Sequence, residues 1–301
     1  MTLYIAALEQ AFLFTPLVLA VYVSYKILKI CDLTAEGSFV FGACLCAICL
    51  QAKLSIFAGV SLAICGGLLA GAITSCLQRA LGFADLISGI LAIFILQSLC
   101  LQSMGRPNIS LYDKPTLISL TSTLCSCISE PYLRLIIAAV VGIALFCILA
   151  KTLTSRLGLI LRAYGNNPKL LEIFGKNDKL YCMIGLMLSN SFSALGGAIT
   201  AQFQGFADIS MGTGTVLIAL SSVIIGVRLS TFLFGRYSTH IVCQLLSCFL
   251  GVFVYFLTVH SLISFGVDPI NLRMCTALIC VAVLGINRKQ LGKKLTTATL
   301  E

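Results

Sequence analysis

Two segments of this 301-residue chain carry the side chains best suited to chemistry, and they resemble one another. Each begins with an acid, a branched aliphatic residue and a hydroxyl residue, and then runs through glycine into an apolar stretch; they span residues 32–43 and 208–219. Carboxylates and hydroxyls can bind an ion or a polar solute. Glycine-rich backbone inside a membrane is tolerated only where protein or a watery cavity covers it. Its recurrence in two halves of a chain therefore points to a translocation site.

The residues that we expect to line this pathway are the acids, hydroxyls and glycines of the two segments. They are Asp32, Thr34, Glu36, Ser38, Asp208, Ser210, Gly212, Thr213, Gly214 and Thr215. A second interpretation of the same side chains stays open. An acid at a helix start interacts favourably with the helix dipole, and a hydroxyl can cap the helix.

The composition requires that these segments be held by membrane-spanning helices. The chain is 59% hydrophobic and 10% charged, with a mean hydropathy of +1.04, whereas a soluble domain has about 25% charged residues. Because one span needs about 20 apolar residues, the sequence predicts an all-α, polytopic transmembrane helical bundle of about 8–10 spans, with broken helices and an inverted repeat. The expected spans lie near residues 5–28, 37–52, 54–78, 84–104, 133–153, 180–202, 213–233, 237–261 and 265–286.

The distribution of lysine and arginine predicts the orientation. We expect one transmembrane domain over residues 1–287 and a basic cytoplasmic tail over 288–301. The loop 151–179 is the richest in cations, so it should also be cytoplasmic. Counting spans back from it puts the N-terminus outside. The segment at Asp32 then leads a span outward and the segment at Asp208 leads one inward, which is the inverted geometry typical of transporters.

Charge and cysteine content exclude two other classes of site. The net charge of +9 is explained by cytoplasmic loops, and no soluble face is left on which a nucleic-acid footprint would cluster. Most of the 15 cysteines lie inside apolar runs, where they act as small packing residues. Partnering histidines and acids are missing near them, so we expect no metal site. The expected environment is a lipid membrane, with no nucleic acid bound.

The cationic loop contains a short predicted helix with clear start and stop signals. Asn167 is a good N-cap, Pro168 suits the first helical position, and Gly175 suits the position after the helix, where a positive φ is favoured. Its expected apolar face consists of Leu170, Leu171, Ile173 and Phe174. Such a helix can lie on lipid or insert its apolar face into a groove on a partner protein. Sequence physics does not choose between these two roles.

The run at residues 161–168, with the helix and the Gly-Lys-Asn that follow it, resembles the cytoplasmic signature of bacterial ABC-importer permeases. The relevant branch holds the branched-chain amino acid and ribose permeases. The chain is most similar to a subgroup of uncharacterised permeases, some of them linked to aromatic amino acid uptake. Four other pieces occur in that family's order, at residues 32–39, 88–91, 105–111 and 205–215. Tyr164, Pro107 and the many cysteines depart from the family pattern.

The resemblance implies a permease subunit of an ATP-driven importer in the bacterial plasma (inner) membrane, for an amino acid or a related small solute. It implies three partners: a cytoplasmic ABC ATPase, an extracytoplasmic substrate-binding protein, and a second copy of the permease or a sister permease. The chain itself would hold no cofactor, and it lacks the phosphate-binding motif of an ATPase. The residues carried over to ATPase coupling are Arg162, Ala163, Gly165, Asn167, Pro168, Leu170, Leu171, Phe174 and Gly175.

The residues bear on two alternatives to this function. A secondary transporter or channel would share inverted repeats and membrane acids, but would need neither the capped loop helix nor an ATPase. An intramembrane enzyme would need a nucleophile with a base, or a metal site of the H-E-x-x-H type. Neither spacing occurs in the sequence, so we expect a transport protein and not an enzyme.

Overall fold

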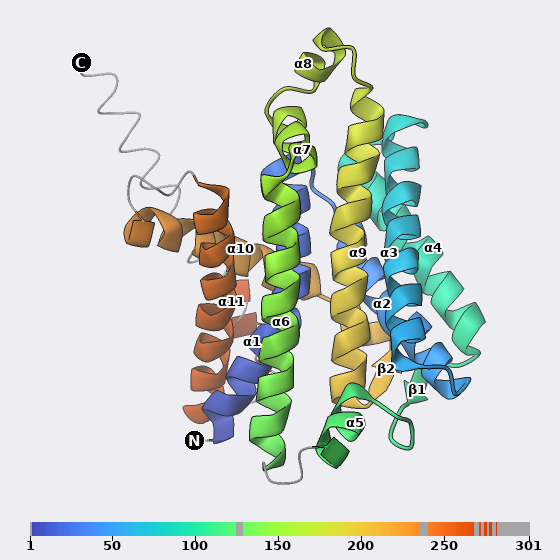
Figure 1. Ribbon diagram of the computed structural model, residues 1–301, viewed down its shortest axis with the longest axis vertical. Coiled ribbons are helices and arrows are strands. Elements are labelled where there is room, and N and C mark those ends of the chain that lie inside the picture. Colours follow the sequence, from blue (N-terminus) through green and yellow to red (C-terminus); the bar gives the residue numbers. More distant parts are fainter. Residues whose placement is uncertain are drawn as a thin grey trace.

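Figure 1 shows a bundle of long helices, as the composition predicts. The computed structural model describes residues 2–124, 129–234 and 240–267, together with residues 271, 274–275, 277–278 and 281. Within these residues, eight helices are long and apolar enough to cross a membrane. They confirm the all-α polytopic prediction and match the first eight expected spans. The ninth expected span, 265–286, lies largely outside the described residues, and the basic tail lies wholly outside them.

The helices and strands have the following bounds in chain order. They are α1 (Thr2–Val21), the π-helix η1 (Tyr22–Leu28), α2 (Thr34–Gln51), α3 (Ile56–Arg79), α4 (Asp85–Met104), β1 (Asn108–Ser110), α5 (Leu117–Leu124), α6 (Glu130–Thr154), α7 (Arg156–Asn166), α8 (Pro168–Ile173), α9 (Asp178–Gln204), β2 (Phe206–Asp208), the 3₁₀ turn η2 (Ile209–Gly212), α10 (Thr215–Phe234) and α11 (Ile241–Ser264).

The two ends of the bundle differ in what they carry. Helices α7 and α8 cap one end, which we call the loop end, while α5 and the strands β1 and β2 lie at the opposite end, which we call the sheet end (Figure 1). The strands pair antiparallel, with Asn108 opposite Asp208. The cationic loop 151–179 is thus at the far end of the bundle from residues 105–124. The strands and α5 are elements that the sequence did not predict.

The centre of the bundle consists of α1 with η1, α2 and α9. Each of these spans has 78% of its most apolar window buried, against 28% for α4. Small residues allow the close approach. A β-carbon added at Gly197 of α9 would lie 1.8 Å from the carbonyl oxygen of Phe39 in α2, and one at Gly42 would lie 2.0 Å from that of Ala194. Helix α9 is continuous through Gly197, so the glycine there serves helix packing.

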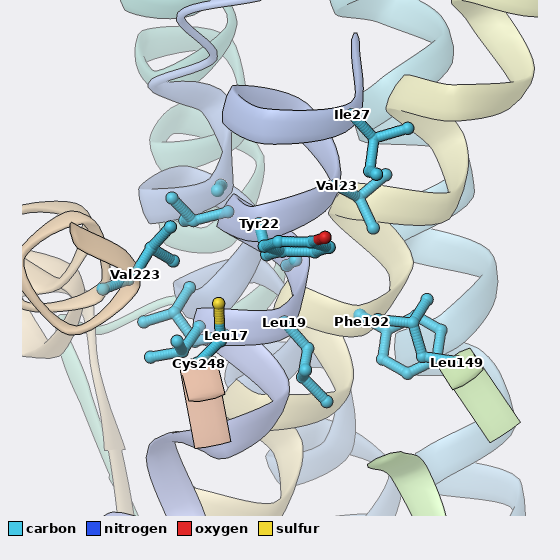
Figure 2. Close-up of a cluster of buried hydrophobic side chains, with 14 of the residues drawn as sticks. Leu17, Leu19, Tyr22, Val23, Ile27, Leu149, Phe192, Val223 and Cys248 are labelled. Atoms are coloured by element: carbon cyan, nitrogen blue, oxygen red, sulfur yellow. The ribbon is translucent and has the colours of Figure 1, made fainter. Parts of the chain in front are cut away.

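The first span changes character at Tyr22, where the α-helix becomes the π-helix η1. Figure 2 shows Tyr22 among Leu17, Val223 and Cys248 in the buried cluster between α1, α10 and α11. The Tyr22 hydroxyl donates to Oε1 of Gln244 at 2.8 Å. The π-helix ends at Lys29, which has a φ of 57°. Short π-helical turns are frequent at functional sites, and this one leads directly into the first of the two similar segments.

Candidate functional site

The first segment begins with a tight turn around Asp32. Its Oδ1 accepts a hydrogen bond from the backbone N–H of Thr34 at 2.9 Å, which satisfies one of the free donors at the start of α2. The carboxyl group is nearly inaccessible, with the residue 5% exposed. Burial raises the pKa of Asp32, and the hydrogen bonds from Thr34 and Asn190 oppose that shift. A buried carboxylate is costly unless it is fully hydrogen-bonded, so its partners determine its role.

The partner on the other carboxylate oxygen is Asn190, in the middle of α9. Its Nδ2 donates to Oδ2 of Asp32 at 2.8 Å, and its Oδ1 accepts from the Ser38 hydroxyl at 2.6 Å. Asn190 and Ser38 are fully buried. One amide therefore joins the turn before α2 to the second turn of that helix, and both to α9. The sequence analysis did not identify Asn190, because its only signal is a single amide within an apolar span.

A second buried contact holds the start of α2 against α3. The Thr74 hydroxyl donates to the Thr34 hydroxyl oxygen at 2.8 Å and to its own helix at Ala70. Both threonines are completely buried. The hydroxyls of Thr34 and Ser38 are thus engaged in helix–helix contacts, and not in the helix capping that the sequence left open as the alternative to a pathway role.

The second segment repeats this arrangement at the sheet end. Oδ1 of Asp208 accepts from the backbone N–H of Ser210 at 2.7 Å and from the Ser210 hydroxyl, while Oδ2 accepts from Nδ2 of Asn108 at 2.9 Å. These bonds, led by those from Ser210, lower the pKa of Asp208. Unlike Asp32, Asp208 lies at an accessible position, and Ser210 beside it is exposed.

The two acids therefore have matching surroundings. Each accepts the N–H of the hydroxyl residue two positions on, and each is bound on its other oxygen by an asparagine from the other half of the sequence. Asp32 follows Lys29, whose Nζ donates to Asn166 of the loop end at 3.1 Å, whereas Asp208 lies in the strand pair at the sheet end. The similar residues thus form similar turns, placed toward opposite ends of the bundle.

The two segments meet between these ends. The Glu36 carboxylate lies close to the backbone N–H of Gly214, and a β-carbon at Gly212 would lie 2.8 Å from the carbonyl oxygen of Glu36. The Thr215 hydroxyl is buried and donates to the carbonyl of Gly212 at 2.7 Å. Thr213 is exposed and Glu36 is half-buried. Of the predicted pathway residues, Glu36, Asp208, Ser210 and Thr213 therefore keep polar groups at accessible positions.

The short helix predicted in the cationic loop is confirmed as α8. The Asn167 side chain accepts from the backbone N–H of Lys169 at 3.2 Å, and Pro168 is the first helical residue. Gly175 has a φ of 67°, in the left-handed region that favours glycine. The residues before Asn167 form a separate helix, α7, so the predicted coupling segment folds as two helices and not one.

The apolar face predicted for α8 is divided between the protein and its surroundings. Leu171 is 3% exposed and belongs to the main buried cluster. By contrast Phe174 is 71% exposed and Ile173 is 79% exposed, and Leu170 is 40% exposed. Leu171 thus attaches α8 to its own bundle, and the side chains free to contact a partner are those of Ile173 and Phe174, with Leu170 beside them.

Helix α7 is fixed firmly to the bundle under α8. A β-carbon at Gly165 would lie 1.8 Å from the carbonyl oxygen of Ile27 in η1, so the two backbones are in direct contact. The Tyr164 hydroxyl accepts from the Arg79 guanidinium at the end of α3, and Tyr164 is 1% exposed. The half-buried Ala163 completes this contact region. The sequence analysis treated Tyr164 only as a departure from a family pattern and missed its partner.

Comparison with known proteins identifies the family to which the chain belongs. Residues 3–284 match the family described as branched-chain amino acid transport system / permease component. An uncharacterised protein of Rickettsia prowazekii is 38% identical over 97% of this chain and 100% of its own length. A tyrosine transport system permease protein of Clostridioides difficile is 32% identical over 98% of this chain and 95% of its own. A nucleoside ABC transporter permease of Lactococcus lactis is 31% identical over 52% and 51%. No solved structure gives a significant match.

Proposed function

The chain belongs to the family of permease components of branched-chain amino acid transport systems, and on that premise we propose that it is the membrane subunit of an ATP-driven importer for a small solute. The eight apolar helices found among the described residues make it a multi-pass membrane protein. We place it in the bacterial inner membrane, with the loop end in the cytoplasm because that end carries the densest run of cations.

The observation that carries the importer proposal is the construction of the loop end. Ile173 and Phe174 project from α8 with most of their surface exposed, while α7 below them is anchored through Gly165 and Tyr164. An exposed apolar pair on a firmly held helix suits insertion into a groove of a partner protein. A cytoplasmic ATPase that moves this pair would also move η1, and η1 leads to the turn at Asp32. This arrangement supports coupling of ATP hydrolysis to the first segment.

We assign different roles to the residues of the two similar segments. Asp32, with Thr34 and Ser38 behind it, positions the start of α2 through buried bonds. Glu36 and Thr213 lie where the two segments meet and keep polar atoms accessible, and these are the side chains that we propose contact solute. The glycines Gly212 and Gly214 and the buried Thr215 shape the turn that brings the segments together. Alternating access would open this meeting point to one side of the membrane at a time.

An amino acid is the solute class that the relatives favour. The relative named as a tyrosine transport system permease aligns over nearly the whole chain, whereas the one named as a nucleoside permease aligns over about half of it. We therefore propose an aromatic amino acid such as tyrosine before a nucleoside. The remaining partners would be a substrate-binding protein outside and a second permease subunit, either a copy of this chain or a sister.

Uptake by cells that express the whole transporter tests both the energy source and the solute. Labelled tyrosine should accumulate, and accumulation should stop when ATP is depleted while persisting when an ionophore collapses the ion gradients at maintained ATP. A Thr213→Val variant should reduce uptake, and Thr258→Val, at an exposed position of α11 outside both segments, should not. Uptake that follows the ion gradient and ignores ATP would identify a secondary transporter instead. Uptake of a labelled nucleoside in place of tyrosine would overturn only the assignment of the solute.

A further inference from the structure

A polar cavity of about 300 Å³ lies at the loop end, away from the two similar segments. Its lining residues come from three helix ends: Thr154 at the end of α6, Arg162 in α7, and His240 with Ile241 at the start of α11. Helices α6 and α11 pack beside one another, and α7 continues from α6 at the loop end (Figure 1). None of these side chains takes part in the contacts of the two Asp turns.

The described residues that line the cavity include the Arg162 guanidinium and no carboxylate. The guanidinium of Arg162 is half-buried, and its Nε donates to the carbonyl of Gly158 at 3.3 Å. Among the described residues, no ion pair joins a carboxylate to Arg162, and the pair between Arg134 and Glu9 lies elsewhere in the bundle. The sequence has no Asp or Glu between residues 130 and 172, nor between 208 and 268. The helices that form the cavity therefore cannot supply a counter-charge near it.

We propose that this cavity binds the headgroup of an acidic phospholipid, with the phosphate on Arg162. A guanidinium matches two phosphate oxygens with two parallel hydrogen bonds. The start of α11 lines the same cavity, and a helix N-terminus favours negative charge. Basic pockets between helix ends on the cytoplasmic side are suited to anionic lipid headgroups.

The place of the cavity favours a lipid over a free phosphate ion. Thr154 ends one spanning helix and Ile241 begins another, so the cavity lies at the depth of the headgroups. Directly below it, α11 carries an exposed apolar stripe with a four-residue spacing, formed by Val242, Leu246 and Leu250, each 38–41% exposed. Acyl chains of a lipid held at Arg162 would cover this stripe. A free phosphate ion would make no contact with it.

The test measures lipid binding and thermal stability of the purified full-length protein. Phosphatidylglycerol should stay bound through detergent exchange, as counted by native mass spectrometry, and should raise the unfolding temperature where phosphatidylcholine and inorganic phosphate do not. Arg162→Gln should bind phosphatidylglycerol about tenfold more weakly, the effect expected for losing one charge-assisted bidentate contact. Arg156→Gln is the matched control, because Arg156 is exposed in the same helix and does not line the cavity.

A second variant keeps the test informative if Arg162→Gln folds poorly. Thr154→Val removes an exposed hydroxyl that lines the cavity and should weaken phosphatidylglycerol binding while leaving the unfolding temperature of the lipid-free protein unchanged. Equal losses in the Arg162 and Arg156 variants would mean that the lipid responds to general surface charge, and would overturn the site. Stabilisation by inorganic phosphate as strong as that by phosphatidylglycerol would overturn the lipid assignment. Neither result bears on whether the chain couples to an ATPase.

Discussion

Asn190 offers the most direct perturbation of the contact between α2 and α9. Asn190→Ala removes the donor to Oδ2 of Asp32 and the acceptor of the Ser38 hydroxyl. Losing a hydrogen bond to a charged group costs about 1.5–3 kcal/mol, and losing the acceptor of a buried hydroxyl costs about 1 kcal/mol more. The free energy of unfolding should fall by roughly 3 kcal/mol. For a chain of this size the unfolding temperature should then drop by about 6–12 °C.

The assay is thermal unfolding in mild detergent, followed by the fraction of protein that remains monodisperse. Asn166→Ala is the matched control, because Asn166 accepts only from Lys29 at an exposed position. Such a surface change alters stability by about 0.5 kcal/mol at most. If the Asn190 and Asn166 variants unfold at the same temperature, the bonds to Asp32 and Ser38 do not stabilise the bundle.

An exchange of the two residues separates geometry from charge. Asn190→Asp alone sets two carboxylates against each other and should destabilise the protein at least as much as alanine does. The double variant Asp32→Asn, Asn190→Asp restores the bond between the two side chains and the bond from Ser38. It does not restore the bond from position 190 to the carbonyl of Leu186, so it should recover part of the lost stability. A double variant as unstable as the sum of the single ones would contradict the assigned hydrogen bonds.

Three further outcomes are expected. Gly165→Ala should lower the unfolding temperature by several degrees, because a β-carbon would lie 1.8 Å from the Ile27 carbonyl oxygen and overpacking costs about 1–3 kcal/mol; wild-type stability would refute the contact between α7 and η1. Asp208→Asn should be less stable than the wild type at neutral pH. Folding lowers the pKa of Asp208. The stabilisation is therefore present above the unfolded value of about 3.9 and is lost as the pH falls through the folded value. In thermal unfolding from pH 7 to pH 3, the difference between the two unfolding temperatures should shrink. Leu171→Asp should unfold the loop end, whereas Phe174→Asp should leave the unfolding temperature unchanged, since only Leu171 is buried.

The sequence was sufficient to predict the elements that depend on local patterns. Apolar runs predicted the eight spans within a few residues, and Asn167, Pro168 and Gly175 predicted α8 because capping depends on neighbouring residues alone. The segments at Asp32 and Asp208 look alike in the sequence, and both form a turn around the acid. These features need no knowledge of what packs against them.

What the sequence could not predict depends on distant contacts. Asn190 lies 158 positions from Asp32, and Arg79 lies 85 positions from Tyr164. No local sequence pattern therefore indicates either contact. The six-residue helix α8 is too short for periodicity to say which apolar side chains face the bundle. Leu171 and Ile173 therefore looked alike in the sequence, although one is buried and the other is exposed. The strand pair between Asn108 and Asp208 was missed because three-residue strands carry almost no pattern.

The measurement that tests the central proposal most directly is purification of the full chain in gentle detergent, with identification of the proteins that accompany it. The wild type should carry an ATPase with a phosphate-binding loop in stoichiometric amount. Phe174→Asp should lose that ATPase while keeping its unfolding temperature, and Lys169→Gln, an exposed polar change in the same helix, should retain it. A folded wild-type protein with no ATPase, or a Phe174→Asp variant with a full complement of it, would contradict the assignment of α8 as the ATPase contact.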